Sequence, residues 1–391
     1  MKNKKYFEII GVLSLSLMLT CAMAISGAIP AMVEEFSNYS RSSVEFLLSV
    51  TSFMMILMVA LSPIISKYIP ERIVIISGLI IYTISGITPV FIQSYPVMFV
   101  SRILLGLGTG LINAKAISMI GERFTGELQQ KLQGIRCSME TLGQTILTLV
   151  AGQLLVFGWN YAFLIYGTSL IILVLFVLFV PERKEDPLAS NNAVLSEKGT
   201  LSLTDMPFLI GNALLGFLMV ATNVSLSLRI SSYVIEAGIG TAADGATIMG
   251  ISTFAGFIAG IVFGSMSKKL GKALLPISLL VGISGLFIVV IANSFLIASI
   301  GAALIGFCVT CCTSIVFGSL PEHFPANTLT TVNAVVLVGC NLGCFSAPLL
   351  LRIADQINPS ISTAFLAYGV IYIILTAGII LKQFVFKSKN K

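Results

Sequence analysis

Charged residues are scarce in this chain, and their scarcity excludes an ordinary soluble domain. Only 10% of the 391 residues are Asp, Glu, Lys or Arg, whereas 56% are hydrophobic, and the mean hydropathy is +0.99. A soluble globular domain carries roughly 25% charged residues. Long apolar runs take the place of the missing charge, so we expect an integral membrane protein.

Histidine and phosphate-binding loops are also rare or missing, which argues against most enzyme classes. The one histidine, His323, falls in an expected cytoplasmic loop, so no set of nucleophile, histidine and acid is plausible. No Gly-x-x-x-x-Gly-Lys-Ser/Thr segment is present to hold a nucleotide. Cys308, Cys311 and Cys312 share their span with no acid or histidine, which favours packing over metal binding. We expect no enzyme activity, no cofactor and no metal.

Apolar runs of membrane-spanning length recur twelve times. A helix needs about 20 mostly apolar residues to cross the hydrocarbon core. The sequence therefore predicts an all-α integral membrane protein with twelve transmembrane helices in two pseudo-symmetric six-helix bundles. The expected spans are 9–32, 44–65, 73–92, 97–120, 134–157, 161–180, 207–231, 244–266, 273–292, 294–318, 330–351 and 362–381.

Lys and Arg are unevenly distributed over the expected loops. An even number of spans puts both termini on one side, and that side holds most of the 23 basic residues, including Lys2, Lys4 and Lys5. The opposite loops hold Arg41 and Arg352. Because basic loops stay in the cytoplasm, we expect cytoplasmic termini in a bacterial-type inner (cell) membrane. The net charge of +6 is then a topology signal, and no nucleic-acid partner is expected.

Two similar halves flank one long polar segment. Residues 181–206 carry Pro, Asn, Ser and mixed charges without apolar periodicity, which predicts a cytoplasmic linker between a bundle at 1–180 and a bundle at 207–391. Short segments repeat at an offset of roughly 200 residues, which indicates duplication. The matches are Ile120–Thr125 with Leu320–Pro325, Leu142-Gly143 with Leu342-Gly343, and Ser62–Tyr68 with Gly264–Leu270.

Several of these segments resemble motifs of the major facilitator superfamily. Its loop motif Gly-x-x-x-Asp-Arg-x-Gly-Arg is similar to Gly264-x-x-x-Lys268-Lys269-Leu270-Gly271-Lys272. Its fourth-helix and sixth-helix patterns are similar to Arg102-x-x-x-Gly106-x-Gly108-x-Gly110 and Trp159-x-x-x-Phe163. The resemblance covers nearly the whole chain. It implies two six-helix halves around a midplane cavity, alternating access and a monomer.

The chain departs from the family pattern at two places. Ser66 and Lys268 stand where the family has Asp, and the family uses this loop as a charge-paired latch, so the acid partner is left open. The expected latch residues are Lys67, Arg72, Gly264, Lys268, Lys269, Gly271 and Lys272. The exporter-associated fifth-helix motif is only partly kept, as Gly143-x-x-x-Leu147-Thr148-x-x-Ala151-Gly152.

Arg102 is expected inside the fourth span, where a buried charge costs at least about 2.5–3.5 kcal/mol and needs a partner or a role. Asn113 lies about 20° from Arg102 on a helical wheel, so both share a face. The resemblance implies that this helix lines the cavity and that Arg102 handles substrate or protons. The alternative is an arginine that reaches the interface and only anchors the helix.

Lys115 and Glu140 are expected at similar depth in the fourth and fifth helices. We expect them to form an ion pair, with Arg136 one turn from Glu140. Alternatively, Glu140 is the proton carrier, since it is the only carboxylate placed well within a span. Glu8 is expected to be solvated at the cytoplasmic margin.

The first span contains no acid between Ile9 and Val33, unlike many drug exporters of the family. The seventh span offers Asn212 and Asn223 on one stripe and Arg229 near its outer end. The balance of Arg102, Lys115 and Arg229 against Glu140 is positive, which favours an anionic or neutral solute over a cation.

The sequence thus predicts a secondary active transporter that moves a small organic solute across the lipid bilayer. The first hypothesis is efflux of an amphipathic compound by proton antiport, with Glu140 and Arg102 as coupling residues. Its rival is a carrier for a small anion, contacted by Arg102 and Arg229. A membrane sensor that binds a ligand without turnover is a third reading, and no added soluble domain supports it.

Overall fold

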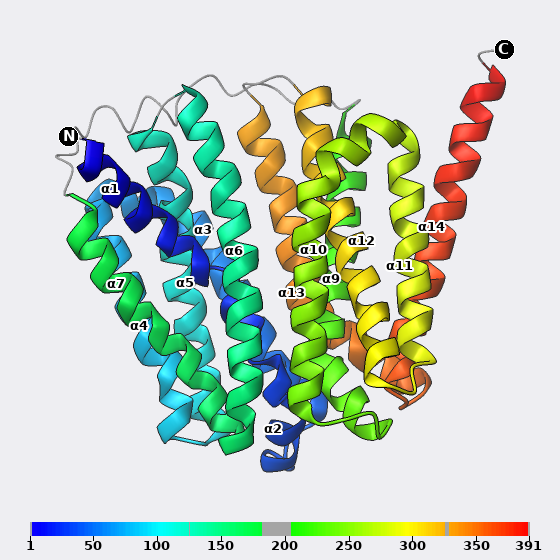
Figure 1. Ribbon diagram of the computed structural model, residues 1–391, viewed down its shortest axis with the longest axis horizontal. Helices are drawn as coiled ribbons and strands as arrows, with labels where there is room; N and C mark the ends of the chain where they lie inside the picture. The colour runs from blue at the N-terminus through cyan, green and yellow to red at the C-terminus, as the bar shows by residue number, and fades with distance from the viewer. Residues whose placement is uncertain (1, 125, 182–204, 325–327, 390–391) are drawn as a thin grey trace. The chain divides into compact units, whose positions relative to one another are not determined.

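The computed structural model describes residues 2–124, 126–181, 205–324 and 328–389, and this part of the chain is helical with no strand (Figure 1). It separates into two compact units, Met1–Thr200 and Leu201–Lys391. Nearly all of the linker predicted at 181–206 lies outside the described residues, so its bounds stay a prediction. Each unit is described by itself.

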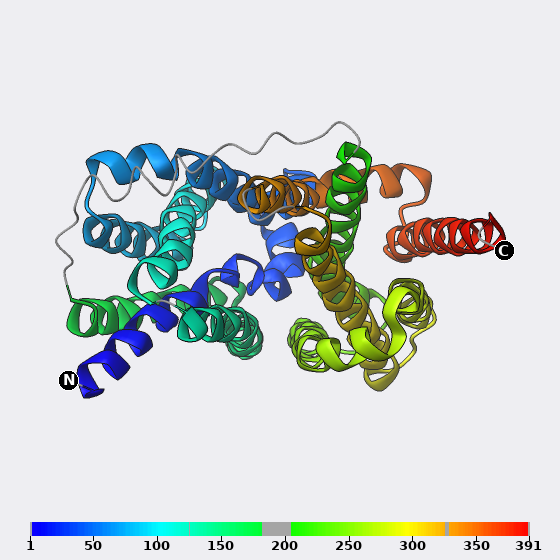
Figure 2. The same cartoon turned by 90° about the horizontal axis from the view of Figure 1, so that it is seen from above.

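The N-terminal unit begins with an interrupted helix. Its pieces are α1 (Lys2–Ser14), the 3-10 turns η1 (Leu15–Met18), η2 (Cys21–Met23) and η3 (Ser26–Ala28), and α2 (Ile29–Glu35). The remaining elements are α3 (Arg41–Tyr68), α4 (Glu71–Phe91), α5 (Tyr95–Arg123), α6 (Gly126–Leu154), η4 (Leu155–Phe157), η5 (Trp159–Gly167) and α7 (Thr168–Phe179). Seen from above, α1 runs obliquely beside α7 (Figure 2).

The C-terminal unit is more regular. It contains α9 (Met206–Glu236), α10 (Ala242–Leu270), η6 (Gly271–Ala273), α11 (Leu274–Val290), α12 (Phe295–His323), α13 (Leu329–Ile357) and α14 (Ser362–Lys389). The side chain of Thr241 starts α10 in a capping box with Asp244, and Ser294 caps α12 through the amide of Ile297. Such caps satisfy amide groups that a helix start leaves without partners.

Ten stretches of the described residues are long and apolar enough to cross a membrane, and the bent first helix raises the number to eleven. One stretch, Ala242–Val290, contains both α10 and α11, which meet at Gly271 with a φ of 49°. The number of spans therefore agrees approximately with the predicted twelve, and the chain is a multi-pass membrane protein.

The first helix differs from its prediction. The sequence predicts one continuous helix over 9–32, whereas the structure bends by 42° between Tyr6–Met18 and Cys21–Glu35. Carbonyls released by the break bind other groups: the Tyr82 hydroxyl donates to the Met18 carbonyl at 3.4 Å, and the Tyr166 hydroxyl donates to the Ala22 carbonyl at 3.1 Å. A break at membrane depth is tolerated only where such partners exist.

The duplication is visible in helix packing. A methyl group on Gly143 of α6 would collide with the Leu17 carbonyl, and one on Gly343 of α13 would collide with the Phe217 carbonyl. Gly306 of α12 meets the Ser252 carbonyl in the way that Gly106 of α5 meets the Thr51 carbonyl. Small residues thus allow close helix contact at equivalent places in both units.

Candidate functional site

The interrupted first helix, from α1 to α2, is called helix 1 below. Polar groups of α4, η5 and α6 contact its break. On one side, Tyr82 of α4 and Tyr166 of η5 hold the Met18 and Ala22 carbonyls. On the other side, the Thr20 hydroxyl donates to the backbone carbonyl of Glu140 in α6 at 3.2 Å. Discontinuous helices provide backbone groups for solute and ion sites in many transporters. We therefore take this break as the centre of the candidate site.

Arg102 of α5 contacts Tyr166, one of the two tyrosines at the break, and is 1% exposed. Its Nη1 donates to the Tyr166 hydroxyl at 3.2 Å, and its Cζ lies 4.9 Å from the ring centre of Phe163 and 5.0 Å from that of Tyr166. Its Nε and Nη2 are buried without a hydrogen-bond partner among the described residues. Aromatic faces stabilise the cation but leave these two donors unsatisfied.

Glu140 of α6 provides the carboxylate on the opposite side. It forms an ion pair with Arg136 one turn earlier, and its side chain is 20% exposed. Lys115 is buried in α5 as expected, and its predicted pair with Glu140 stays a prediction. Residues four apart on one helix lie close together, so Arg136 reaches the Glu140 carboxylate from within α6.

Arg229 of α9 has a carboxylate partner of its own. Its Nη1 and Nη2 donate to the two oxygens of Asp355 in α13 at 2.9 and 2.8 Å. Arg229 is 1% exposed, and this two-point contact neutralises it. The prediction that Arg229 contacts an anionic solute therefore receives no support, because both terminal nitrogens of its guanidinium already bind Asp355.

The two predicted asparagines of α9 differ in their contacts. Asn212 donates to the Phe208 carbonyl at 2.9 Å and accepts from the Ser319 hydroxyl of α12 at 3.3 Å, so it joins α9 to α12. Asn223 is half-buried, and its amide makes no hydrogen bond to the described residues. Asn223 is the freer of the two to meet a solute.

A sequence model of the Major Facilitator Superfamily matches residues 11–348. The chain belongs to the major facilitator superfamily. The family consists of transporters, which are not enzymes in general, that bind small-molecule substrates, often with protons, and typically work as monomers. A search of curated protein sequences finds no significant match.

Three solved structures have the same fold as this superfamily member. A D-xylose–proton symporter is 17% identical with a TM-score of 0.74 and covers 96% of this chain and 97% of its own. The peptide transporter POT is 12% identical with a TM-score of 0.76, covering 95% and 93%. The nucleoside transporter NupG is 14% identical with a TM-score of 0.71, covering 97% and 99%. At these identities the likeness concerns the fold alone.

The superfamily's fourth-helix glycines serve helix packing in this chain. Gly106 and Gly110 of α5 meet the backbone of α3, and Gly108 meets the backbone of α4. Asn113, predicted to share the face of Arg102, donates to the sulfur of Met55 in α3 at 3.7 Å. The face that carries these residues therefore contacts α3, while Arg102 turns to η5.

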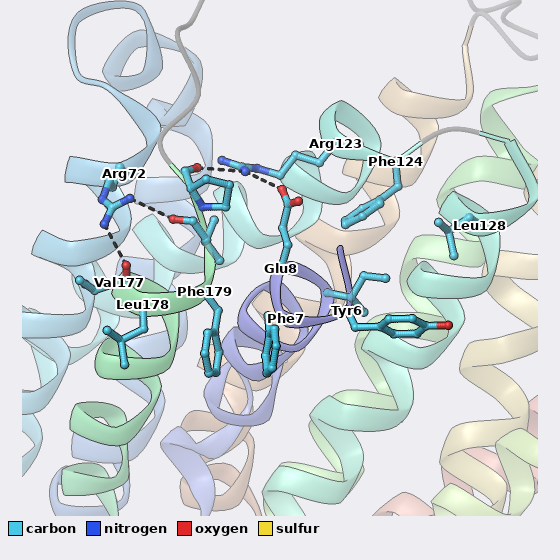
Figure 3. A pocket seen from close by; sticks show the side chains of 13 residues that line it. Tyr6, Phe7, Glu8, Arg72, Arg123, Phe124, Leu128, Val177, Leu178 and Phe179 are labelled. Carbon is cyan, nitrogen blue, oxygen red and sulfur yellow. Dashed lines mark hydrogen bonds and ion pairs between the residues drawn. The ribbon is translucent and has the colours of Figure 1, made fainter. Parts of the chain in front are cut away.

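Two arginines near the ends of α1, α5 and α7 have partners in the N-terminal unit (Figure 3). Arg123, the last residue of α5, donates to Glu8 of α1 at 2.9 Å and to Glu71 of α4 at 3.2 Å. Glu8 is thus paired rather than simply solvated as predicted. Arg72 donates to the Val177 and Val180 carbonyls at 3.0 and 2.9 Å, which satisfies the free end of α7.

These residues line a pocket of about 1010 Å³ at the ends of α1, α5 and α7. Its two arginines already have partners in the unit: Arg123 pairs with Glu8, and Arg72 binds carbonyls of α7 and the residue after it. The side chain of Lys67 lies outside the described part of the chain. In the second half, Gly264, Lys268, Lys269, Gly271 and Lys272 are exposed around the turn after α10.

Sequence reasoning missed the aromatic residues around Arg102. Tyr82, Phe163 and Tyr166 are buried; the rings of Phe163 and Tyr166 contact the guanidinium, and Tyr82 packs against Tyr166. A buried arginine without a carboxylate in reach needs aromatic or carbonyl partners, and this need is the signal that could have indicated them. It also missed Glu45, which is completely buried near the start of α3 and lies 3.5 Å from Arg41.

Proposed function

We propose that this superfamily member is a proton-coupled secondary transporter that exports a small amphipathic compound by alternating access, with both termini in the cytoplasm and the protein in the cell membrane. The observation that carries the proposal is the hydrogen bond from Thr20, at the break of the first helix, to the backbone carbonyl of Glu140, which puts this acidic residue next to the break. A carboxylate beside a discontinuous helix places a titratable group where solute and ion sites form in such transporters.

The partial exposure of Glu140 supports its role as proton carrier. Its side chain is 20% exposed, and its backbone holds Thr20 at the break. Protonation removes the attraction to Arg136 and releases a cation next to helix 1. A solute with an acceptor group then competes with the carboxylate for Arg136. Export is proposed because α6 keeps Gly143 and Gly152 of the exporter pattern, and Gly143 contacts helix 1.

A second candidate is a carrier for a small organic or inorganic anion. The observation that favours it is Arg102, which has no ion-pair partner among the described residues and keeps two buried donors unsatisfied. A carboxylate or phosphate group of a solute would satisfy both donors at once. The two candidates differ in their carrier group, Glu140 in the first and Arg102 in the second.

The experiment is solute transport in everted membrane vesicles energised by respiration, with collapse of the pH gradient as the readout. We expect collapse on adding amphipathic compounds, and a loss of at least about tenfold in Glu140→Gln because the proton carrier is gone. Glu35→Gln is the matched control, since Glu35 is an exposed carboxylate at the end of α2, and it should behave as wild type.

Two results would count against proton-coupled export. An unchanged pH profile in Glu140→Gln removes Glu140 as the proton carrier. A lack of response to amphipathic compounds, together with Arg102-dependent uptake of small organic anions, replaces the proposal with the anion carrier.

A further inference from the structure

Tyr166 lies between a buried cation and the break of helix 1. Its hydroxyl accepts a hydrogen bond from Nη1 of Arg102 at 3.2 Å and donates one to the Ala22 carbonyl at 3.1 Å. A tyrosine hydroxyl has one proton to donate, and here that proton goes to helix 1. The Ala22 carbonyl in the 3-10 turn η2 and the guanidinium of Arg102 are thus joined through a single oxygen.

The surrounding residues hold the Tyr166 ring in place. The ring is 1% exposed and lies 5.5 Å from the ring of Tyr82, at an interplanar angle of 75°. Gly86 of α4 is directly behind it, and a side chain at that position would collide with Cβ of Tyr166. Because the ring is packed on several sides, its hydroxyl cannot follow Arg102 without a change in its neighbours.

We infer that Tyr166 is a positioning residue that couples the binding state of Arg102 to the bend of helix 1. Arg102 enters this bond through Nη1 alone, while its buried Nε and Nη2 have no partner. An acceptor group that binds these two atoms draws the guanidinium toward itself. The bond to Tyr166 then weakens or moves, and the support of the Ala22 carbonyl changes with it.

The inference rests on the proposed function, because it assigns Arg102 to the solute- or proton-handling site. It adds the route by which that site acts on the discontinuous helix. Helix 1 has a 3-10 backbone from Leu15 to Ala28 with short interruptions, so few internal bonds oppose a change of its bend. A poorly bonded segment of this kind opens more readily than a continuous α-helix.

The test is hydrogen–deuterium exchange of the helix 1 peptide in the purified, full-length protein without any solute. Tyr166→Phe keeps the ring and removes the hydroxyl. We expect amide exchange over residues 15–28 to rise by about three- to tenfold. Arg102→Gln should produce a rise of similar size, and the double variant should exceed neither single variant, because both changes break the same link.

Tyr82→Phe is the matched control. Tyr82 is equally buried and donates to the same break at the Met18 carbonyl, but its hydroxyl is not bonded to Arg102. Its effect on exchange should therefore be the same in the wild-type and Arg102→Gln backgrounds. An additive effect is the expected behaviour of a residue that supports helix 1 independently of Arg102.

Three outcomes would overturn the inference: no change of exchange in a folded Tyr166→Phe protein, independent effects of Tyr166→Phe and Arg102→Gln, or equal coupling of Tyr82 to Arg102. If Tyr166→Phe does not fold, Arg102→Lys takes its place, since it keeps the charge and loses the bond to Tyr166. Unchanged exchange in Arg102→Lys would also overturn it. Since no solute or pH gradient is used, a failed transport proposal leaves this result interpretable.

Discussion

At the scale of single residues, the charges within the spans are distinguished by their partners. Arg136 has Glu140, Arg229 has Asp355, and Arg102 has aromatic rings and one hydroxyl. A buried arginine that loses its carboxylate is left as an uncompensated charge in a low-dielectric surrounding. The Arg229–Asp355 pair is therefore expected to stabilise the C-terminal unit, whereas Arg102 keeps two buried donors without a partner among the described residues.

We predict that Asp355→Asn lowers the free energy of unfolding by on the order of 3 kcal/mol, because Arg229 stays buried without its counter-charge. The measurement is thermal unfolding of the purified protein in detergent. Arg352→Gln is the control: Arg352 is exposed one turn earlier on α13, and its replacement should leave the unfolding temperature unchanged. Equal destabilisation by both variants would show that the pair contributes nothing specific.

At the scale of elements, glycines set the distance between helices. Gly143 and Gly343 contact carbonyls of helix 1 and α9, so a methyl group has no space at either position. Gly318 of α12 has nothing within 4 Å of an added Cβ. We predict that Gly143→Ala and Gly343→Ala each cost about 1–3 kcal/mol, as overpacking does. Gly318→Ala should be neutral or slightly stabilising, since alanine favours helix.

Unfolding temperatures of the three alanine variants check this prediction. A Gly143→Ala protein as stable as Gly318→Ala would mean that helix 1 moves away at no cost. Such a result would indicate that the break lets helix 1 shift, because α9 is continuous at the equivalent place and has less freedom to move.

At the scale of the whole molecule, the sequence predicts the number and order of helices because apolar length and Lys/Arg distribution act over whole spans. It does not predict the break of helix 1, which depends on Tyr82, Tyr166 and Glu140 from three other elements. It places Arg102 and Glu140 correctly in their helices and puts Arg136 one turn from Glu140, but it does not show the contact between Glu140 and Thr20 of helix 1. Distances between side chains of different helices are set by packing, and packing is not a property of any one segment.

The two halves share their packing but not their charges. Positions roughly 200 residues after Arg102, Arg136 and Glu140 are held by Ala302, Val336 and Cys340, all buried. The charged groups around the first-helix break therefore have no counterpart in the second half.

A contact between a basic and an acidic residue recurs at the end of the fourth helix of each half, with arginine in the first half and histidine in the second. Arg123 at the end of α5 pairs with Glu8, and at the equivalent end of α12 His323 lies 3.6 Å from Asp205 and stacks on Phe208 at 4.1 Å. Arginine carries a permanent charge and five N–H donors, whereas histidine offers two ring nitrogens.

We predict that His323→Arg raises the unfolding temperature by about 1–3 °C. The arginine gives Asp205 a permanent counter-charge, as Arg123 gives one to Glu8 in the first half. The gain is small because the two side chains are 44% and 35% exposed and therefore screened by water. Asp205→Asn should abolish the difference between His323 and the arginine variant. An equal gain in the Asp205→Asn background would mean that arginine stabilises this end of α12 by packing on Phe208, without any contribution from the ion pair.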